Sequence, residues 1–118
     1  KSLGARTVNL DADEHDRVYA AVSHLPHIIA YALVNAVADI DNSYVKFAGQ
    51  GFKDSTRIAS SSPEIWRDIS LMNKKNILKS IKVFKKNLDS LGRHIQKSNS
   101  PALEKEFKKA RTLREDVR

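Results

Sequence analysis

Residues 18–40 read VYAAVSHLPHIIAYALVNAVADI, and this stretch decides the fold. Its apolar side chains recur every three or four positions, the spacing that places them on one face of an α-helix. Pro26 stands in the middle of the run, where a proline removes a backbone donor and costs about 3 kcal/mol. We therefore expect a long, kinked core helix from about residue 13 to residue 40. An adjoining polar stripe consists of His24, His27, Tyr31 and Asn35.

The residues before this helix differ from it in character. Residues 1–10, KSLGARTVNL, favour a single strand because Thr7 and Val8 are β-branched. A lone strand has nothing in this chain to pair with. We therefore expect residues 1–10 to be the tail of a separate domain and residues 11–118 to form one helical domain, with Asp11 as a candidate cap.

Start signals recur after residue 40. Glycines and serines in residues 41–62 favour a short helix, a turn and a second short helix near residues 53–60. Ser62 and Pro63 begin another helix, Asn73 can cap the next one, and Ser100 with Pro101 opens the last. The sequence thus predicts an all-α fold, a helical bundle with a remnant strand at its N-terminus.

The helix after Asn73 carries a pronounced apolar stripe. Its members are Ile77, Ile81, Phe84, Leu88, Leu91 and Ile95. They alternate steps of four and three residues, as in helices that bury one face against another helix. This is more apolar face than so small a chain can cover, which indicates a partner surface and predicts a homodimer.

Composition narrows the class of protein. The 118 residues include no cysteine, which excludes a disulfide scaffold and fits a cytoplasmic protein. Polar residues interrupt the longest apolar stretch, so we expect no membrane span. The net charge of +7 is uneven, because residues 74–118 hold 14 Lys and Arg against 5 Asp and Glu. A solvated outer face explains these cations better than nucleic-acid binding does.

Metal, nucleophilic and nucleotide chemistry find little support. His24 and His27 lie three residues apart near Glu14, His15 and Asp16, but no third ligand repeats the spacing, so we expect no metal. The alternative is that both histidines are satisfied by hydrogen bonds within the bundle. There is no Gly-x-Ser-x-Gly elbow, glycine-rich dinucleotide motif or P-loop, so we assign no catalytic or cofactor-binding residue to this chain.

An anion site is better supported. Lys53 and Arg57 are four residues apart, on one face of a predicted short helix that follows two glycines. A guanidinium matches a carboxylate or phosphate, and Asp54 can hold it in place. A plain surface pair of Asp54 and Arg57 is the alternative. Trp66, the only tryptophan, is more typical of a core or interface anchor.

Three segments together carry a resemblance. HDRVYAAVSHLPHIIAYAL (15–33), GQGFKDSTRIASSSPEIWRDI (49–69) and NKKNIL (73–78) resemble the C-terminal helical domain of prephenate dehydrogenases. The resemblance implies an all-helical domain that dimerises, often with exchanged helices, and follows a domain that binds NAD or NADP. It also implies that residues 1–10 are the closing strand of that cofactor domain.

The resemblance assigns a substrate site. It implies that Ser23, His24 and His27 line the cleft, with His27 at the ring hydroxyl end of the substrate. It implies that Lys53, Asp54 and Arg57 bind and gate, with Arg57 on a substrate carboxylate, and that Trp66 lies near the entrance. The general base of the family belongs to the cofactor domain, so none of the present histidines takes that role.

The implied reaction is the oxidative decarboxylation of prephenate to 4-hydroxyphenylpyruvate, with tyrosine as a further ligand. The sequence departs from the family at Gln50, where many relatives have a glycine run, and at Lys53, where arginine is common. These departures keep arogenate dehydrogenase open as an alternative. A stand-alone basic helical adaptor for nucleic acid or an acidic protein is the alternative from another class.

Overall fold

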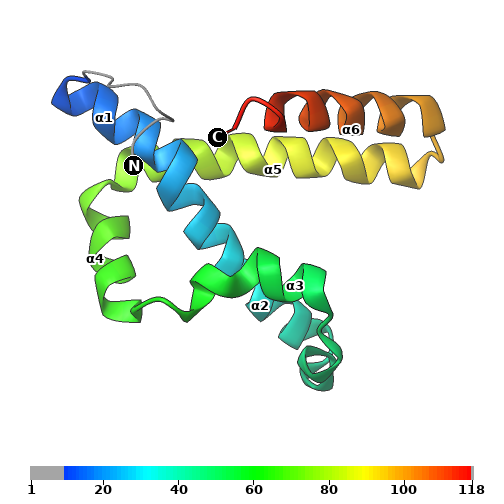
Figure 1. The fold of residues 1–118 in the computed structure, drawn as a ribbon, viewed down its shortest axis with the longest axis horizontal. Coiled ribbons are helices and arrows are strands. Elements are labelled where there is room, and N and C mark those ends of the chain that lie inside the picture. The colour runs from blue at the N-terminus through cyan, green and yellow to red at the C-terminus, as the bar shows by residue number, and fades with distance from the viewer. Residues whose placement is uncertain (1–9, 118) are drawn as a thin grey trace. The chain divides into compact units, whose positions relative to one another are not determined.

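The computed structural model describes residues 10–117, and within them it contains helices and turns but no strand (Figure 1). The predicted all-α class is confirmed. The strand predicted in residues 1–10 lies outside the described residues, apart from Leu10. The described residues divide into two compact units: Ala12–Ile81 is one, and residues 82–117 together with Leu10 and Asp11 belong to the other. The domain boundary expected near residue 10 stays a prediction.

The long first helix forms as three consecutive segments. These are α1 (Ala12–Tyr19), the π-helical turn η1 (Ala20–His24) and α2 (Leu25–Ile40). Leu25 donates its N–H to the carbonyl of Ala20, and Pro26 follows in the first turn of α2. A π-turn widens the helix by one residue, so the proline ring is accommodated where a regular helix would clash with it. The predicted helix is confirmed, and the π-turn explains how it tolerates Pro26.

Short helices pack against α2. They are the 3-10 turn η2 (Asn42–Phe47), α3 (Gln50–Thr56) and the 3-10 turn η3 (Arg57–Ser60). Asp41 caps η2 by accepting from the backbone N–H of Ser43 at 2.9 Å. The second short helix was expected near 53–60; it begins at Gln50 instead, and its helical type changes at Arg57. The hydroxyl of buried Thr56 donates to the carbonyl of Phe52 at 2.6 Å, a side-chain bond that competes with the helix ladder.

The helix α4 (Pro63–Met72) starts as predicted. Ser62 accepts from the backbone N–H of Ile65 at 3.2 Å, and Pro63 occupies the first helical position. Tyr31 of α2 donates its hydroxyl to the carbonyl of Ser61 at 2.9 Å, which ties α2 to the segment before α4. Two interactions therefore hold the start of α4: its own cap at Ser62 and the hydrogen bond from Tyr31 to Ser61.

The helices α5 (Lys74–Gln96) and α6 (Ser100–Arg114) run antiparallel (Figure 1). His94 of α5 and Glu106 of α6 form an ion pair with an N–O distance of 2.7 Å. The cap of α6 is Asn99, one residue before the predicted Ser100; its side chain accepts from the N–H of Ala102. The turn between the helices contains Ser98, whose φ is 52°.

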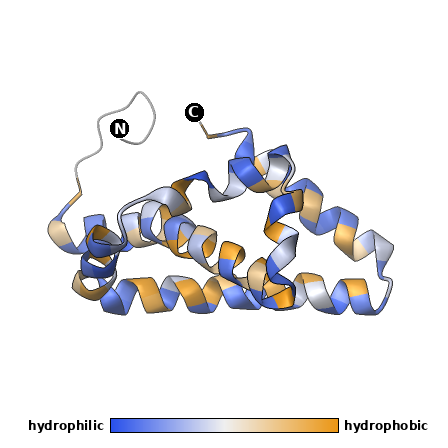
Figure 2. Ribbon diagram, turned by 90° about the horizontal axis from the view of Figure 1, so that it is seen from below, coloured by the Kyte–Doolittle hydropathy of each residue, from blue (hydrophilic) through white to orange (hydrophobic). Residues whose placement is uncertain are grey.

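Little of the described chain is closed off from solvent. Its buried hydrophobic residues are Ala20, Ala30 and Ile77. By contrast Ile40, Phe47 and Met72 are 74%, 81% and 88% exposed. Figure 2 shows hydrophobic residues recurring along the helices. The apolar faces of this chain therefore lack the cover that a folded monomer usually provides.

The stretch Ala12–Ile40 also has the length and composition of a membrane-crossing helix. Its most apolar 18-residue window has a mean hydropathy of 1.4, and 11% of that window is buried in this chain. Core helices of soluble proteins share these properties. The expectation that the stretch does not span a membrane rests on His24, Pro26 and His27 in its middle, and it stays a prediction.

Candidate functional site

The site forms where the middle of the long helix meets α4. His27, in the first turn of α2, stacks on Trp66 with ring centroids 3.7 Å apart and an interplanar angle of 15°. His24, the last residue of η1, approaches the same indole edge-on at 5.9 Å and 75°. Three of the residues predicted from the sequence thus form one aromatic cluster, and each is half-buried.

The local backbone fixes the ring of His27. Its Nδ1 lies 3.0 Å from the carbonyl oxygen of Ser23, one turn earlier. A carbonyl only accepts, so Nδ1 carries the proton and donates. Ser23, the fourth predicted residue, therefore contributes its backbone to the cluster.

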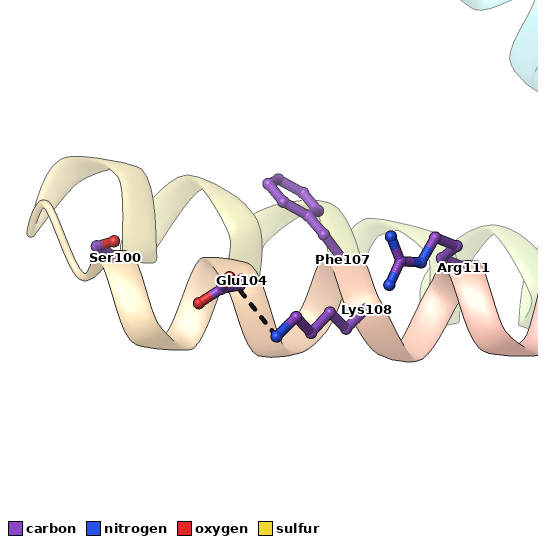
Figure 3. A pocket seen from close by; sticks show the side chains of 5 residues that line it. All are labelled: Ser100, Glu104, Phe107, Lys108 and Arg111. Atoms are coloured by element: carbon purple, nitrogen blue, oxygen red, sulfur yellow. Dashed lines mark ion pairs between the residues drawn. The ribbon is translucent and has the colours of Figure 1, made fainter.

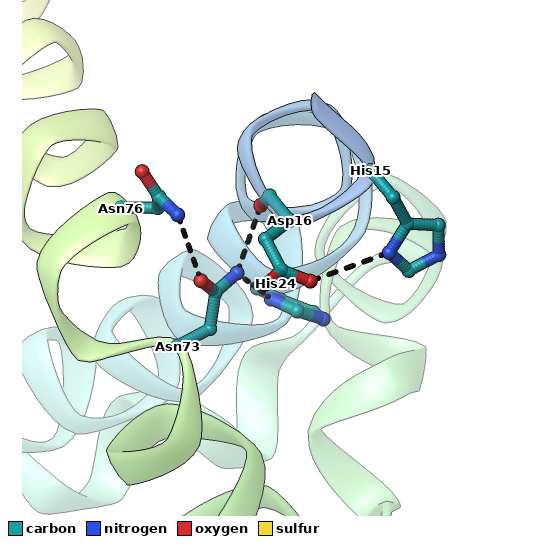
Figure 4. Close-up of polar contacts among 5 residues, drawn as sticks. All are labelled: His15, Asp16, His24, Asn73 and Asn76. Carbon is teal, nitrogen blue, oxygen red and sulfur yellow. Dashed lines mark hydrogen bonds and ion pairs between the residues drawn. The ribbon is translucent and has the colours of Figure 1, made fainter. Parts of the chain in front are cut away.

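Asn73 is a member of the cluster that sequence reasoning missed. It was expected to cap α5, but its side-chain amide contacts Asp16 and His24 instead (Figure 4). Its Nδ2 lies 2.9 Å from the carbonyl oxygen of Asp16 and 3.3 Å from Nδ1 of His24. The only local signal of this role was the presence of a polar residue, Asn73, at the boundary between two predicted helices.

The environment of His24 disfavours its charged form. Burial lowers the pKa of His24 below its ordinary 6.5, and the imidazoles of His27 and His15 lower it further. The carboxylate of Asp16 acts in the opposite direction and raises that pKa. Asp16 also lies 3.4 Å from Nδ1 of His15, which stacks on Tyr19. Because desolvation is the largest of these effects, the neutral imidazole of His24 is favoured over the charged form.

The predicted anion-binding residues lie elsewhere in the same unit. Lys53 and Asp54 are on α3 and Arg57 begins η3, and all three side chains are exposed. The suggested bond from Asp54 to Arg57 does not form; Asp54 accepts from Gln50 at 2.8 Å instead. Within residues 10–117 no hydrogen bond or ring contact joins Arg57 to the histidine cluster. The 3-10 turn η3, which begins at Arg57, packs against α2, the helix that carries His27.

A hollow lies along α6, apart from these residues. It measures about 510 Å³ and is lined by Ser100, Glu104, Phe107, Lys108 and Arg111 (Figure 3). Glu104 and Lys108 form an exposed ion pair at 3.6 Å, and Phe107 is 56% exposed. All five residues come from one helix, so the hollow is an uncovered helix face. It contains none of the site residues predicted from the sequence.

A metal site would need more ligands than the histidines supply. In the described part of the chain, no group of three or more His, Asp or Glu side chains could hold one ion. His24 and His27 turn their rings toward Trp66 and make hydrogen bonds to Asn73 and Ser23. The three-residue spacing of His24 and His27 thus lets both rings pack on the indole of Trp66.

The fold and the cluster together define a class of domain. An all-helical chain with uncovered apolar faces is a helical association domain, which completes its core against further polypeptide. Residues 11–109 match the family described as "Prephenate dehydrogenase, dimerization domain". The chain belongs to this family.

Relatives agree with this assignment. The chain is 38% identical to the prephenate dehydrogenase of Bacillus subtilis (strain 168), over 99% of its own length and 32% of the relative's. It resembles the structure of prephenate dehydrogenase from A. aeolicus in complex with hydroxyphenyl propionate and NAD+, with a TM-score of 0.84 and 39% identity, covering 91% of this chain and 38% of that one. Synechocystis arogenate dehydrogenase gives a TM-score of 0.82 at 29% identity, covering 92% and 41%. The chain spans about a third of the length of the curated relatives it matches.

Proposed function

We propose that this chain is the substrate-binding and dimerisation part of an NAD(P)-dependent prephenate dehydrogenase. The observation that carries the proposal is the cluster of two imidazoles against one indole, His24 and His27 on Trp66. The resemblance read from the sequence implies that His24 and His27 line the substrate cleft and that Trp66 lies near its entrance. The A. aeolicus relative, whose structure contains hydroxyphenyl propionate and NAD+, supports an aromatic acid as the ligand.

The proposed reaction is the oxidative decarboxylation of prephenate. Hydride would leave ring carbon 4 for the nicotinamide as the bond between that carbon and its hydrogen breaks. The bond from ring carbon 1 to its carboxylate also breaks, carbon dioxide leaves, and the electron pair of that bond makes the ring aromatic. The hydroxyl proton, taken up by a base during hydride transfer, returns to the phenolate oxygen, which gives 4-hydroxyphenylpyruvate. In this proposal the base is outside the present chain, and the work of this chain is to hold a doubly charged substrate in position.

Each residue of the site has a role in this proposal. Arg57 binds a substrate carboxylate through its planar fork, with Lys53 as a second cation one helical turn away. His24 and His27, backed by Trp66, contact the ring. Asp54 helps to gate the site from α3. Because Arg57 and Lys53 are exposed and uncompensated by Asp54, their charges are available to an anion.

The nicotinamide cofactor would accept the hydride, and no residue of this chain is assigned to hold it. The chain has no glycine-rich dinucleotide fingerprint: Gly49 and Gly51 are not followed by a third glycine three residues later, and Gly4 and Gly92 stand far from them. We therefore propose that NAD or NADP is bound mainly by a domain that precedes these residues in the intact protein. The share of its relatives that the chain spans, about a third, is consistent with a separate cofactor domain.

We further propose a cytoplasmic homodimer that takes tyrosine as a second ligand and does not bind nucleic acid. The name of the family and the uncovered apolar faces support the dimer. Exchange of helices between protomers is part of the same proposal. The prephenate dehydrogenases among its relatives support the compartment.

Arogenate is the alternative substrate, because the arogenate dehydrogenase of Synechocystis has a similar fold. The two substrates differ in an amino group against a keto group on the side chain of the molecule. Assaying the intact protein with both, and with NAD and NADP in turn, decides between them. If neither substrate is oxidised with either cofactor, the proposed function is wrong.

Arg57→Ala in the intact protein tests the site. Charge-assisted hydrogen bonds contribute about 1.5–3 kcal/mol, so we expect kcat/KM for prephenate to fall roughly 10- to 100-fold. Arg67→Ala is the matched control, because Arg67 is exposed on α4 and pairs with Asp68 at 3.0 Å. An unchanged kcat/KM in Arg57→Ala, measured by cofactor reduction, would remove Arg57 from the site.

A further inference from the structure

Asn73 lies between α4 and α5 and is half-buried. Figure 4 shows its side-chain amide between three partners. Its Nδ2 lies 2.9 Å from the backbone carbonyl of Asp16 and 3.3 Å from Nδ1 of His24. Its Oδ1 accepts from Nδ2 of Asn76 at 3.0 Å. One amide thus connects α1, η1 and the first turn of α5.

These partners leave the amide only one orientation. The carbonyl of Asp16 can only accept, so the nitrogen of the Asn73 amide must face it. A flipped amide would set two carbonyl oxygens against each other. The amide of Asn76 follows this choice, because it must then offer its nitrogen to Oδ1 of Asn73.

The orientation of Asn73 determines the tautomer of His24. Nδ2 of Asn73 carries two hydrogens, one for the carbonyl of Asp16 and one for Nδ1 of His24. Nδ1 of His24 must therefore accept and carry no proton. A protonated Nδ1 would place two donors 3.3 Å apart. The neutral ring then has its proton on Nε2.

Nε2 of His24 is the ring nitrogen that stays available to a ligand. Among residues 10–117 none bonds to it, and no buried side-chain nitrogen there lacks a partner, so this atom is not fully buried. His27 has the opposite arrangement, because its Nδ1 donates to Ser23 and leaves a lone pair on Nε2. The two neutral imidazoles on this indole therefore differ at Nε2, which donates in His24 and accepts in His27.

We propose that Asn73 is a positioning residue that fixes His24 as an uncharged donor, so that its Nε2–H bonds an acceptor oxygen of the ligand. The inference rests on the proposed function only in naming that ligand an aromatic acid. Charge recognition is then left to Arg57 and Lys53, and the histidine cluster recognises the ligand by hydrogen bonding. Asn73 acts through His24 and need not touch the ligand.

The charged surroundings of His24 agree with this role. Asp16 and His15 face it from α1 and His27 faces it from α2, and among them only Asp16 favours protonation. From the junction of α4 and α5 the neutral amide of Asn73 faces Nδ1. An acid at position 73 would reverse that preference, because a carboxylate there accepts where the amide donates.

The tautomer is measured on the intact protein with ¹⁵N-labelled histidine. We expect Nδ1 of His24 to give the shift of an unprotonated nitrogen and Nε2 that of a protonated one, with His24→Gln used for assignment. A proton on Nδ1 in the neutral ring overturns the proposal. This measurement needs neither substrate nor turnover, so its result is separate from the outcome of the activity assays.

Asn73→Asp tests the cause. The change keeps the shape of the side chain but replaces the donor with a carboxylate, so we expect the proton affinity of His24 to rise about tenfold or more. The ¹⁵N shifts of both ring nitrogens of His24 then change over a higher pH range, as the ring becomes protonated. The acid limb of the kcat/KM profile moves to higher pH with them. Asn87→Asp adds the same charge on α5, where Asn87 only donates to Val83, and should leave His24 unchanged. An unaltered titration of His24 in Asn73→Asp would overturn the proposal.

Discussion

His24 is subject to opposing electrostatic effects from its surroundings. Burial and the imidazoles of His27 and His15 lower its pKa, while Asp16 raises it. The net direction is downward, so the folded protein binds a proton at His24 less readily than the unfolded chain does. Stability therefore depends on pH through this residue.

The sign of that dependence follows from the direction of the pKa shift. At pH values above the ordinary 6.5 of an unfolded histidine, His24 is neutral in both states and contributes nothing to the slope. As pH falls below 6.5 the unfolded chain takes up the proton first, so the free energy of unfolding falls. It stops falling once the pH is below the lowered pKa of the folded state. We expect His24→Gln to lose part of this acid-side fall.

Urea unfolding of the intact protein and of His24→Gln at pH 5.5 and 7.5 checks the prediction. The interval from pH 7.5 to 8.5 is an internal control, because His24 is neutral there in both states. If the two proteins lose the same stability between pH 7.5 and 5.5, the burial of His24 has no effect on proton binding.

At the residue scale the sequence predicted the cluster better than the contacts that organise it. The spacing of His24 and His27 and the presence of Trp66 were visible, and the structure brings these residues together. Asn73 lies 49 residues after His24, and nothing in local periodicity predicts that two such residues meet. Asn73 also had a satisfactory local explanation as a cap, which hid its long-range contact.

At the scale of elements, the turn from α5 to α6 is strained at one residue. The N–H of Asn99 bonds the carbonyl of His94, and that of Ser98 bonds the carbonyl of Ile95, which is the Schellman pattern. The left-handed position of that motif usually holds glycine, but here Ser98 has a φ of 52°. A side chain at this position costs roughly 1–2 kcal/mol.

Ser98→Gly should therefore raise the free energy of unfolding by about 1 kcal/mol, after allowing for the extra freedom that glycine gives the unfolded chain. Ser80→Gly within α5 is the matched control and should lower it by about 0.5 kcal/mol, since glycine is the poorer helix former. Chemical denaturation of both variants measures the difference. A destabilised Ser98→Gly would show that the serine side chain itself supports the turn.

Helix starts were predictable because they are local. Ser62 with Pro63 gave the start of α4 correctly, and Asn99 moved the start of α6 by one residue. The π-turn before Pro26 was not predictable from periodicity, because a single inserted residue barely alters the apolar spacing. The start of α3 at Gln50 was missed because two glycines nearby favoured a turn.

At the scale of the whole chain, the described residues bury little apolar surface. Among the described residues Ala20, Ala30 and Ile77 are the buried hydrophobic ones, and no large side chain is fully enclosed. A domain of this length normally buries well over half of the surface that its unfolded chain exposes. The apolar stripe of α5 is instead accessible at Leu88 and Ile95, which are 57% and 63% exposed. The sequence predicted this excess of apolar surface, but it could not tell which faces cover one another.

Leu88→Glu tests whether the stripe of α5 is the dimer contact. In a two-fold dimer each subunit contributes the same patch, so one substitution places two carboxylates in the interface. Burying an unpaired charge is costly enough that we expect the dissociation constant to rise at least about tenfold. Asn87→Glu adds the same charge one residue earlier on an exposed position and should leave the dimer intact. Sedimentation of the intact protein at micromolar concentration distinguishes the cases. If the parent protein is a monomer, the proposed dimer is wrong. If Leu88→Glu forms a dimer as tight as that of the parent, the contact lies on another face.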